Sequence, residues 1–200
     1  MMFKNIEPIK ILKKYLKSKI RIDHSISTAS FMKKYAKQFN INQDYAYYAG
    51  LFHDLAKEIS DNKIIELTES FIERNIINIK YYDYKKKHPV LLHGVASAEI
   101  ILNMYGIDNK EILEAICNHT CGGNDLSDLS IFTFISDFCE PLRKYPPSRK
   151  IYKIIVKEKK LYKAYLYTYI YLIKRLLIKK KIIVPDSIDG YNYALRLYKD

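Results

Sequence analysis

The sequence is poor in the residues that make tight turns. Glycine and proline occur six times each in 200 residues, too few for an architecture of many strands joined by sharp reversals. Long stretches also lack any residue that breaks a helix. With 48% apolar and 28% charged residues, the composition is that of a globular domain with a real core. We therefore expect a mostly helical protein made of one domain, residues 1–200.

The sequence also lacks a long apolar run. In the apolar C-terminal segment the longest stretch without charge, residues 164–173, has ten residues, about half the length of a membrane-spanning helix. The first seven residues have no apolar signal-peptide core. Three cysteines, an odd number, fit reduced thiols. These absences predict a cytoplasmic protein that does not bind a membrane through a spanning helix.

Acidic residues are scarce at one end of the chain. Residues 1–140 hold 18 basic and 18 acidic side chains, whereas residues 141–200 hold 16 basic and four acidic ones, which accounts for the net charge of +12. A one-sided positive field attracts phosphate-rich partners such as nucleic acid, an anionic membrane surface or a small polyphosphate. Lysine-rich coding by an A+T-rich genome explains the same surplus equally well.

Apolar residues recur at helical spacing along most of the chain. Breakers and capping residues, among them Asp44, Asp108 and Asp186, divide this pattern into segments. The expected helices are residues 6–20, 21–39, 44–58, a shorter one from 61 or 62, 90–105, 108–119, 129–138, a long one over 151–177, and 186–198. Residues 80–87 and 120–128 are predicted loops.

Histidine is rare, yet its placement indicates a metal site. His53 is followed directly by Asp54, and such a pair offers an imidazole nitrogen and a carboxylate to one cation, with the second carboxylate oxygen free for another cation or a water. A bundle brings inward-facing positions of different helices together. His24, His53, Asp54 and Asp137 therefore predict a mixed nitrogen and oxygen site suited to iron, manganese or another first-row cation.

Single signals of this kind are weak, because a lone histidine on an apolar helix is usually structural. The ordered set is stronger: His24, His53-Asp54, His93-Gly94, His119-Thr120 and Asp137 follow one another at intervals of about 20 to 40 residues. A zinc site at Cys117-Asn-His119-Thr-Cys121 is disfavoured, because no second cysteine pair completes four ligands.

This order of residues resembles the HD-domain metallophosphohydrolases, and more narrowly the bacterial HD-type symmetrical bis(5'-nucleosyl)-tetraphosphatases. The resemblance runs from about residue 21 to the end of the chain, and Asp-x-x-Glu-Pro-x-Arg is its most specific element. The matching segments are Arg21-Ile-Asp-His24, His53-Asp-Leu-Ala-Lys57, His93-Gly94, His119-Thr120, Asp137-Phe-Cys-Glu-Pro-Leu-Arg143 and residues 184–192. Val95-Ala-Ser-Ala98 departs from the family pattern Pro-Val-Gly-Ala.

The resemblance implies an all-α, single-domain HD-type bundle, with a metal-site core at about 21–143 and basic C-terminal helices at 148–200. It implies one or two iron ions, for which manganese or cobalt can substitute, and the cleavage of diadenosine tetraphosphate into two ADP. His24, His53, Asp54 and Asp137 would hold metal. His93 and His119 are left open between contacts to phosphate and ligands of a second ion.

The same resemblance places Arg21, Lys57, Thr120 and Arg143 around a dinucleoside polyphosphate or an ADP-like nucleotide, and a homodimer is left open. As catalytic residues we single out Asp54, which can orient water or accept its proton, and Lys57. Lys57 lies one helical turn from His53, where its ammonium can meet a phosphate oxygen.

Two alternatives remain at this level. The first keeps the metal site but changes the substrate to a nucleoside monophosphate, a guanosine alarmone or a cyclic nucleotide. The second, less favoured, is a non-catalytic module that binds nucleic acid through the lysines of residues 150–181, with an affinity that falls steeply with salt.

Overall fold

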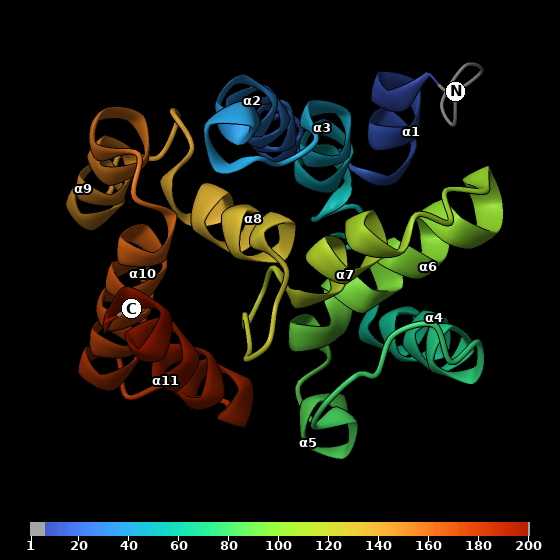
Figure 1. Ribbon diagram of the computed structural model, residues 1–200. Helices are drawn as coiled ribbons and strands as arrows, with labels where there is room; N and C mark the ends of the chain where they lie inside the picture. Colours follow the sequence, from blue (N-terminus) through green and yellow to red (C-terminus); the bar gives the residue numbers. More distant parts are fainter. Residues whose placement is uncertain (1–6, 200) are drawn as a thin grey trace.

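The computed structural model describes residues 7–199 and contains only helices, turns and loops in that range (Figure 1). This confirms the expected all-α class. The α-helices are α1 Pro8–Tyr15, α2 Lys19–Tyr35, α3 Gln43–Phe52, α4 Asp61–Glu73, α5 Tyr82–Lys86, α6 His93–Tyr105, α7 Lys110–Asn118, α8 Asp128–Cys139, α9 Pro146–Lys153, α10 Leu161–Ile178 and α11 Pro185–Lys199. None of them is long and apolar enough to cross a membrane.

Helix α8 is the central element of the fold. It packs against α2, α3 and α7 on one side and against α9 and α10 on the other, and Figure 1 shows it between these two groups. Nine of the twelve residues of α8 are buried, including the small polar residues Ser130, Thr133 and Ser136. The α2–α3 pair, α7 and the helices α9 and α10 therefore meet around one helix, while α6 packs on α7 and α11 on α10.

Several predicted helix boundaries differ from the structure. The predicted helix 44–58 ends at Phe52, and residues 53–59 form consecutive turns. Its cap is Asn42, whose side-chain oxygen accepts the N–H groups of Asp44 and Tyr45. Asn109 rather than Asp108 caps α7. Both caps lie one or two residues from the predicted ones, because capping requires an extended backbone as well as a suitable side chain.

The predicted helices at both ends of the chain are also interrupted. The first is shorter than residues 6–20: α1 ends at Tyr15, α2 begins at Lys19, and the predicted start at residue 6 lies outside the described residues. The predicted helix 151–177 is two helices, separated by a π-helical turn over Ile154–Glu158 and by Lys159 at φ 56°. The turn keeps adjacent apolar residues buried and turns the lysines outward.

The predicted loop 80–87 contains the short helix α5. Its Lys85 is buried and its ammonium lies 2.9 Å from the Asp186 carboxylate at the start of α11. This ion pair joins segments about 100 residues apart. A run of lysines predicts a solvated loop. The local pattern does not show that one of these lysines is buried in an ion pair with a carboxylate far along the chain.

Two buried tyrosines of α10 hold the loop that follows α7. The Tyr169 hydroxyl accepts the N–H of Gly123 at 2.9 Å and donates to the Cys121 carbonyl at 3.3 Å, while the Tyr165 hydroxyl donates to the Gly123 carbonyl. Gly122 has φ 67°, and a Cβ there would lie 1.8 Å from the Tyr169 hydroxyl. Only glycine fits this turn, which fixes the chain just beyond His119.

Candidate metal centre

Six of the predicted site residues meet in one cluster at the centre of the fold. Five of them are buried, and only the Asp137 side chain is partly exposed, at 29%. They come from α2 (His24), the turn after α3 (His53, Asp54), the first residue of α6 (His93), the residue after α7 (His119) and the last turn of α8 (Asp137). Five separate segments of chain thus converge, as the spacing in the sequence predicts.

Backbone carbonyls fix the orientation of three of the imidazole rings. The Nδ1 atoms of His53, His93 and His119 lie 2.8, 2.6 and 2.8 Å from the carbonyl oxygen three residues earlier. A carbonyl oxygen only accepts hydrogen bonds, so each Nδ1 carries the proton and donates it. The neutral ring then presents the lone pair of Nε2 to the cluster, which is the arrangement typical of metal-ligating histidines.

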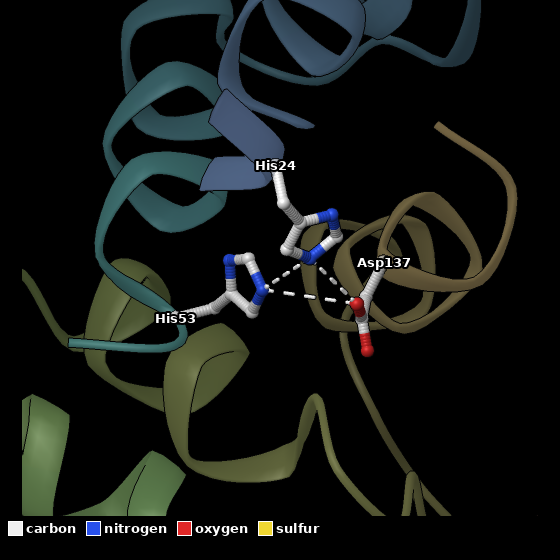
Figure 2. A group of neighbouring side chains, drawn as sticks. All are labelled: His24, His53 and Asp137. Carbon is white, nitrogen blue, oxygen red and sulfur yellow. Dashed lines mark hydrogen bonds and ion pairs between the residues drawn. The ribbon is translucent and has the colours of Figure 1, made fainter. Parts of the chain in front are cut away.

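One half of the cluster consists of His24, His53 and Asp137 (Figure 2). The two Nε2 atoms are 3.2 Å apart, and the Asp137 Oδ1 lies 3.0 Å from that of His24 and 3.8 Å from that of His53. In Figure 2 all three side chains point toward one another from three different segments. The arrangement offers two nitrogens and one oxygen to a single cation.

The other half consists of Asp54, His93 and His119. The Nε2 of His93 lies 2.9 Å from both the Asp54 Oδ1 and the His119 Nε2, and the His119 Nε2 is 3.4 Å from the same oxygen. The other oxygen of Asp54, Oδ2, is 3.8 Å from the His53 Nε2. Asp54 therefore faces both halves, one oxygen toward each.

The donor set fits a bound cation. Lone pairs on neutral Nε2 atoms and on carboxylate oxygens repel one another at these separations, so only positive charge stabilises them there. Ligand atoms about 2.1 Å from a common metal are about 3.0 to 3.4 Å apart, and most of the separations in the cluster are close to this range. Among residues 7–199 two groups of side chains are placed to hold an ion, and both contain only imidazoles and carboxylates: His24, His53 and Asp137, and His53, Asp54 and His119.

His24 differs from the other histidines because carboxylates anchor it. Burial lowers the pKa of His24, but hydrogen bonds to Asp137 and to Glu140, whose Oε1 lies 3.1 Å from Nδ1, outweigh burial and raise that pKa to about 9. Without metal, His24 holds a proton on Nε2, at the position where a cation would bind. Metal binding must release this proton.

The pKa values of His53, His93 and Asp54 are lowered rather than raised. Burial lowers the pKa of His53 to about 3 and that of His93 to about 4, so both rings are neutral at physiological pH. Burial alone would raise the pKa of Asp54, but the surrounding imidazoles hold it well below its usual range. Asp54 is consequently ionised, and ionised carboxylates and neutral imidazoles are the forms that bind metals.

Three of the other predicted site residues border the cluster. The Lys57 ammonium lies 2.9 Å from the His93 Nε2 and 3.4 Å from the Asp54 Oδ1. The Thr120 hydroxyl lies 3.3 Å from the His119 Nε2, and the Arg143 Nη2 donates to the Asp137 Oδ1 at 2.7 Å. These cationic and hydroxyl groups lie beside the oxygens and nitrogens of the cluster, where phosphate oxygens would meet them.

Arg21 is placed differently. Its Nε lies 3.1 Å from a Glu58 oxygen, and Glu58 also accepts the N–H groups of Lys17 and Ser18 at the start of α2. Among the described residues the structure gives Arg21 no contact with the cluster. The family motif places Arg21 at the nucleotide and does not reveal its ion pair with Glu58, because Glu58 lies in a turn 37 positions later in the chain.

Sequence reasoning missed the contacts that support the cluster. Glu140 forms an ion pair with Arg143 at 3.7 Å and also holds the His24 ring, with its Oε1 3.1 Å from Nδ1, a contact that the sequence did not indicate. The Ser97 hydroxyl accepts the N–H of Ala56 at 2.9 Å and so ties the turn after His53 to α6. Gly94 allows α6 and α7 to approach, since a Cβ there would lie 2.5 Å from the Ile116 carbonyl.

Comparison with known proteins identifies the family. The model of the HD domain matches residues 21–159. The chain belongs to the HD-domain family. The HD motif itself is His53-Asp54, the pair that lies between the two halves of the cluster. The identification agrees with the family expected from the ordered histidines and aspartates.

Several similar proteins match most of this chain. A symmetrical bis(5'-nucleosyl)-tetraphosphatase of Staphylococcus aureus is 28% identical over 98% of this chain and 99% of its own, and one of Halalkalibacterium halodurans is 29% identical over 88% and 89%. A Clostridium acetobutylicum crystal structure, described as a predicted HD superfamily hydrolase involved in NAD metabolism, has a TM-score of 0.86 and 27% identity over 98% of this chain and all of its own. The protein is an HD-domain hydrolase with a single HD-type fold.

Proposed function

We propose that this HD-domain hydrolase is a metal-dependent phosphoanhydride hydrolase that cleaves diadenosine tetraphosphate symmetrically into two ADP. The observation that carries the proposal is the cluster itself, in which four Nε2 atoms and two carboxylates face one another. Two relatives that match most of the chain are named for this activity. The uneven charge of the chain suits a polyanionic substrate.

The proposed metal ligands are His24, His53, Asp54 and Asp137. The Asp54 carboxylate faces both halves of the cluster, and His93 and His119 would hold a second cation rather than contact phosphate alone. Nitrogen and oxygen donors of this kind suit iron, with manganese or cobalt as substitutes. Such a cation, when bound, screens the phosphate charge and lowers the pKa of a water molecule toward ~7.

The side chains around the cluster have separate proposed roles. Asp54 orients the attacking water. Its pKa lies well below the usual range, so the carboxylate stays ionised and accepts a hydrogen bond from water. Lys57 reaches the same oxygen of Asp54 and binds an oxygen of the attacked phosphate. The Nη1 group of Arg143 has no protein partner among residues 7–199 and donates to a neighbouring phosphate. Thr120 lines the same site.

The reaction is the addition of water across the central P–O–P bond. The water oxygen forms a new bond to one of the two inner phosphorus atoms, and the bridging oxygen leaves with the other half. Both products are ADP, and the two protons of water pass to the products or the solvent. Because the substrate is symmetrical, attack on either inner phosphorus gives the same pair.

Product analysis tests this proposal. Purified protein loaded with iron, manganese or cobalt is incubated with diadenosine tetraphosphate in water enriched in ¹⁸O. The nucleotides are then separated and their masses measured by mass spectrometry. We expect ADP as the only nucleotide product, with one labelled terminal phosphate for every unlabelled one. ATP with AMP would contradict symmetrical cleavage, and the absence of turnover with all three metals would refute the proposed substrate.

A nucleotide panel distinguishes this substrate from those of other HD-type enzymes. The panel contains nucleoside monophosphates, a guanosine tetraphosphate, cyclic nucleotides and NAD, the last because the Clostridium protein is described in NAD metabolism. We expect diadenosine tetraphosphate to have the highest kcat/KM. A higher value for another compound would keep the metal chemistry and replace the substrate. Salt-sensitive binding of nucleic acid without hydrolysis would favour the non-catalytic alternative.

A further inference from the structure

A cavity opens directly from the metal centre toward the C-terminal helices. Its volume is about 210 Å³, and its walls include His119 and Asp137 at one end and Tyr145 and Arg175 at the other. A second, more open cavity of about 650 Å³ continues outward past Lys144 and Lys179. The two cavities share Arg143, Tyr145 and Arg175 among their lining residues. A path thus leads from the cluster to the surface over α8, α9 and α10.

The two arginines on this path are held differently. Arg143 donates to the Asp137 carboxylate and carbonyl and lies near Glu140, so much of its charge is offset by carboxylates. The guanidinium of Arg175, on α10, forms no ion pair or hydrogen bond with another side chain within residues 7–199. Its contact is with the ring of Tyr145, whose centroid lies 5.5 Å from Cζ. Arg175 therefore offers uncompensated charge and free donors to the cavity.

Aromatic side chains line the same cavity as the arginines. Phe138 and Tyr145 form an edge-to-face pair with centroids 6.1 Å apart, and Phe134 and Leu172 extend the apolar surface. Ser148 also lines the cavity; it is 2% exposed, and its hydroxyl has no partner in the part of the chain that the structure describes. A cavity with a cation-binding end, a free guanidinium and an aromatic wall matches a phosphate chain joined to a base.

We infer that Arg175 and Tyr145 form the subsite for one nucleoside diphosphate half of the substrate, an assignment that rests on the proposed function. The terminal phosphate of this half lies at the metal centre and Arg143. The phosphate next to the nucleoside binds Arg175, and the base stacks on Tyr145 where the cavity opens to solvent. The other half of the substrate extends away from this cavity.

Three ligands of increasing length separate the contributions. Orthophosphate occupies only the metal end, pyrophosphate also reaches Arg175, and ADP adds the base that stacks on Tyr145. Binding of each to the metal-loaded protein is measured by calorimetry for the wild type, Arg175→Gln, Tyr145→Leu and Lys174→Gln. Lys174 is exposed, adjacent in the chain and not in the cavity lining, so Lys174→Gln removes the same charge without removing the proposed contact.

Arg175→Gln should weaken pyrophosphate and ADP by about 10- to 100-fold, the loss expected for a hydrogen bond to a charged group, and leave orthophosphate within threefold. Tyr145→Leu should weaken ADP alone, by about 5- to 10-fold. Lys174→Gln should change none of the three by more than threefold. Equal losses in Arg175→Gln and Lys174→Gln, or a comparable loss for orthophosphate, would overturn the subsite, because general charge would then explain the binding.

Kinetics with diadenosine tetraphosphate separate this inference from the proposed function. If wild-type protein cleaves the compound, Arg175→Gln should raise KM by about 10- to 100-fold with kcat nearly unchanged, since the contact is made equally before and during the reaction. If wild-type protein does not cleave it while ADP binding still depends on Arg175, the proposed reaction fails and the subsite stands. Cleavage with an unchanged KM in Arg175→Gln would overturn the subsite alone.

Discussion

Helices α2–α8 and helices α9–α11 contribute differently to the same site. The six clustered imidazole and carboxylate groups come from α2, α6, α8 and the residues that follow α3 and α7, and all lie within residues 1–140, where basic and acidic residues are equal in number. The later helices add the free guanidinium of Arg175 and the two tyrosine hydroxyls that hold the loop after His119. Their charge is almost entirely positive.

This difference has a physical reason. A cation site needs carboxylates, and two of those in the cluster also meet a cationic side chain, Asp54 with Lys57 and Asp137 with Arg143, whereas a surface that attracts a polyphosphate needs cations without partners. A chain that separates the two kinds of charge can satisfy both needs. The substitutions below test whether the early helices carry the chemistry and the late helices carry support and recognition.

The largest effect is expected at the carboxylate that both halves of the cluster share. Asp54→Asn keeps the size of the side chain but removes the negative charge, so hydrolysis should fall by on the order of 10³-fold or more and bound metal should be lost. Metal content and kcat/KM measure both effects. Asp44→Asn, an exposed carboxylate of α3 paired with Lys33, should change neither; equal losses in the two variants would contradict the assignment.

The second-largest loss of activity is expected at Gly94, where α6 and α7 approach each other closely. In Gly94→Ala the new Cβ would lie 2.5 Å from the Ile116 carbonyl and 2.9 Å from the His119 Nδ1, so the helices must separate and His93 must move from His119. We expect kcat/KM to fall by about 10²-fold and unfolding free energy to fall by about 1–3 kcal/mol.

Gly106→Ala provides the matched control for this variant. Gly106 has φ 63° and open space around it, so alanine there should cost about 1–2 kcal/mol of stability without changing kcat/KM. Urea unfolding and steady-state kinetics on both variants separate the two effects. If Gly94→Ala and Gly106→Ala lose activity in proportion to stability, close approach of α6 and α7 does not position the cluster.

The next effect concerns the proton on His24. Because its pKa is raised to about 9, metal binding should tighten by about tenfold per pH unit as pH rises toward 9 and then level off. Glu140→Gln keeps the hydrogen-bond acceptor but removes its charge, which should lower the pKa of His24 and flatten this dependence. Metal titrations at pH 7, 8 and 9 measure the slope; identical slopes in the two proteins would contradict the role of Glu140.

The same proton affects the stability of the metal-free protein. A histidine with a raised pKa in the folded state contributes stability that is fully present below its unfolded pKa of ~6.5 and is lost as pH rises through about 9. His53 and His93, with pKa values lowered to about 3 and about 4, are neutral in both states above pH 7.5 and add little slope there. Thermal unfolding should therefore shift to lower temperature between pH 7 and 9, less so in Glu140→Gln.

The smallest effect tests the support given by α10. Tyr169→Phe removes a buried hydroxyl and leaves the Gly123 N–H without its partner, which should lower the free energy of unfolding by about 1–3 kcal/mol and kcat/KM by a few-fold. Tyr167→Phe, two residues earlier and partly exposed, should leave both values unchanged. A loss of activity as large as that of Asp54→Asn would mean that α10 takes part in the chemistry itself.

The sequence predicted the helical class and the convergence of the cluster for related reasons. Apolar periodicity reports which face of a helix is buried; His24 and Asp137 lie within α2 and α8, whereas His53-Asp54 and His119 directly follow the ends of α3 and α7. It did not predict the break near Lys159 or the burial of Lys85. Both depend on packing between distant segments, which local spacing does not contain.

The supporting contacts were harder to predict than the residues of the cluster. Glu140 has the same local pattern whether it holds Arg143 or His24, and only the tertiary fold brings its Oε1 to the His24 ring. Arg175 lies in a lysine-rich segment with the composition of a solvated face, and its place in the cavity follows from how α10 packs on α8. For Arg21 the motif was the misleading signal. The family resemblance assigns its guanidinium to the nucleotide, but in the fold the guanidinium forms an ion pair with Glu58.

The ring anchors differ in how mutation can reach them. His53, His93 and His119 donate to main-chain carbonyls, and every amino acid carries that acceptor, so a change of side chain at position 50, 90 or 116 cannot delete it. His24 relies on the side chain of Glu140, which one codon change removes. In a library of random variants, single substitutions should therefore leave the hydrogen bonds that orient His53, His93 and His119 intact, whereas a substitution at position 140 removes the one that orients His24.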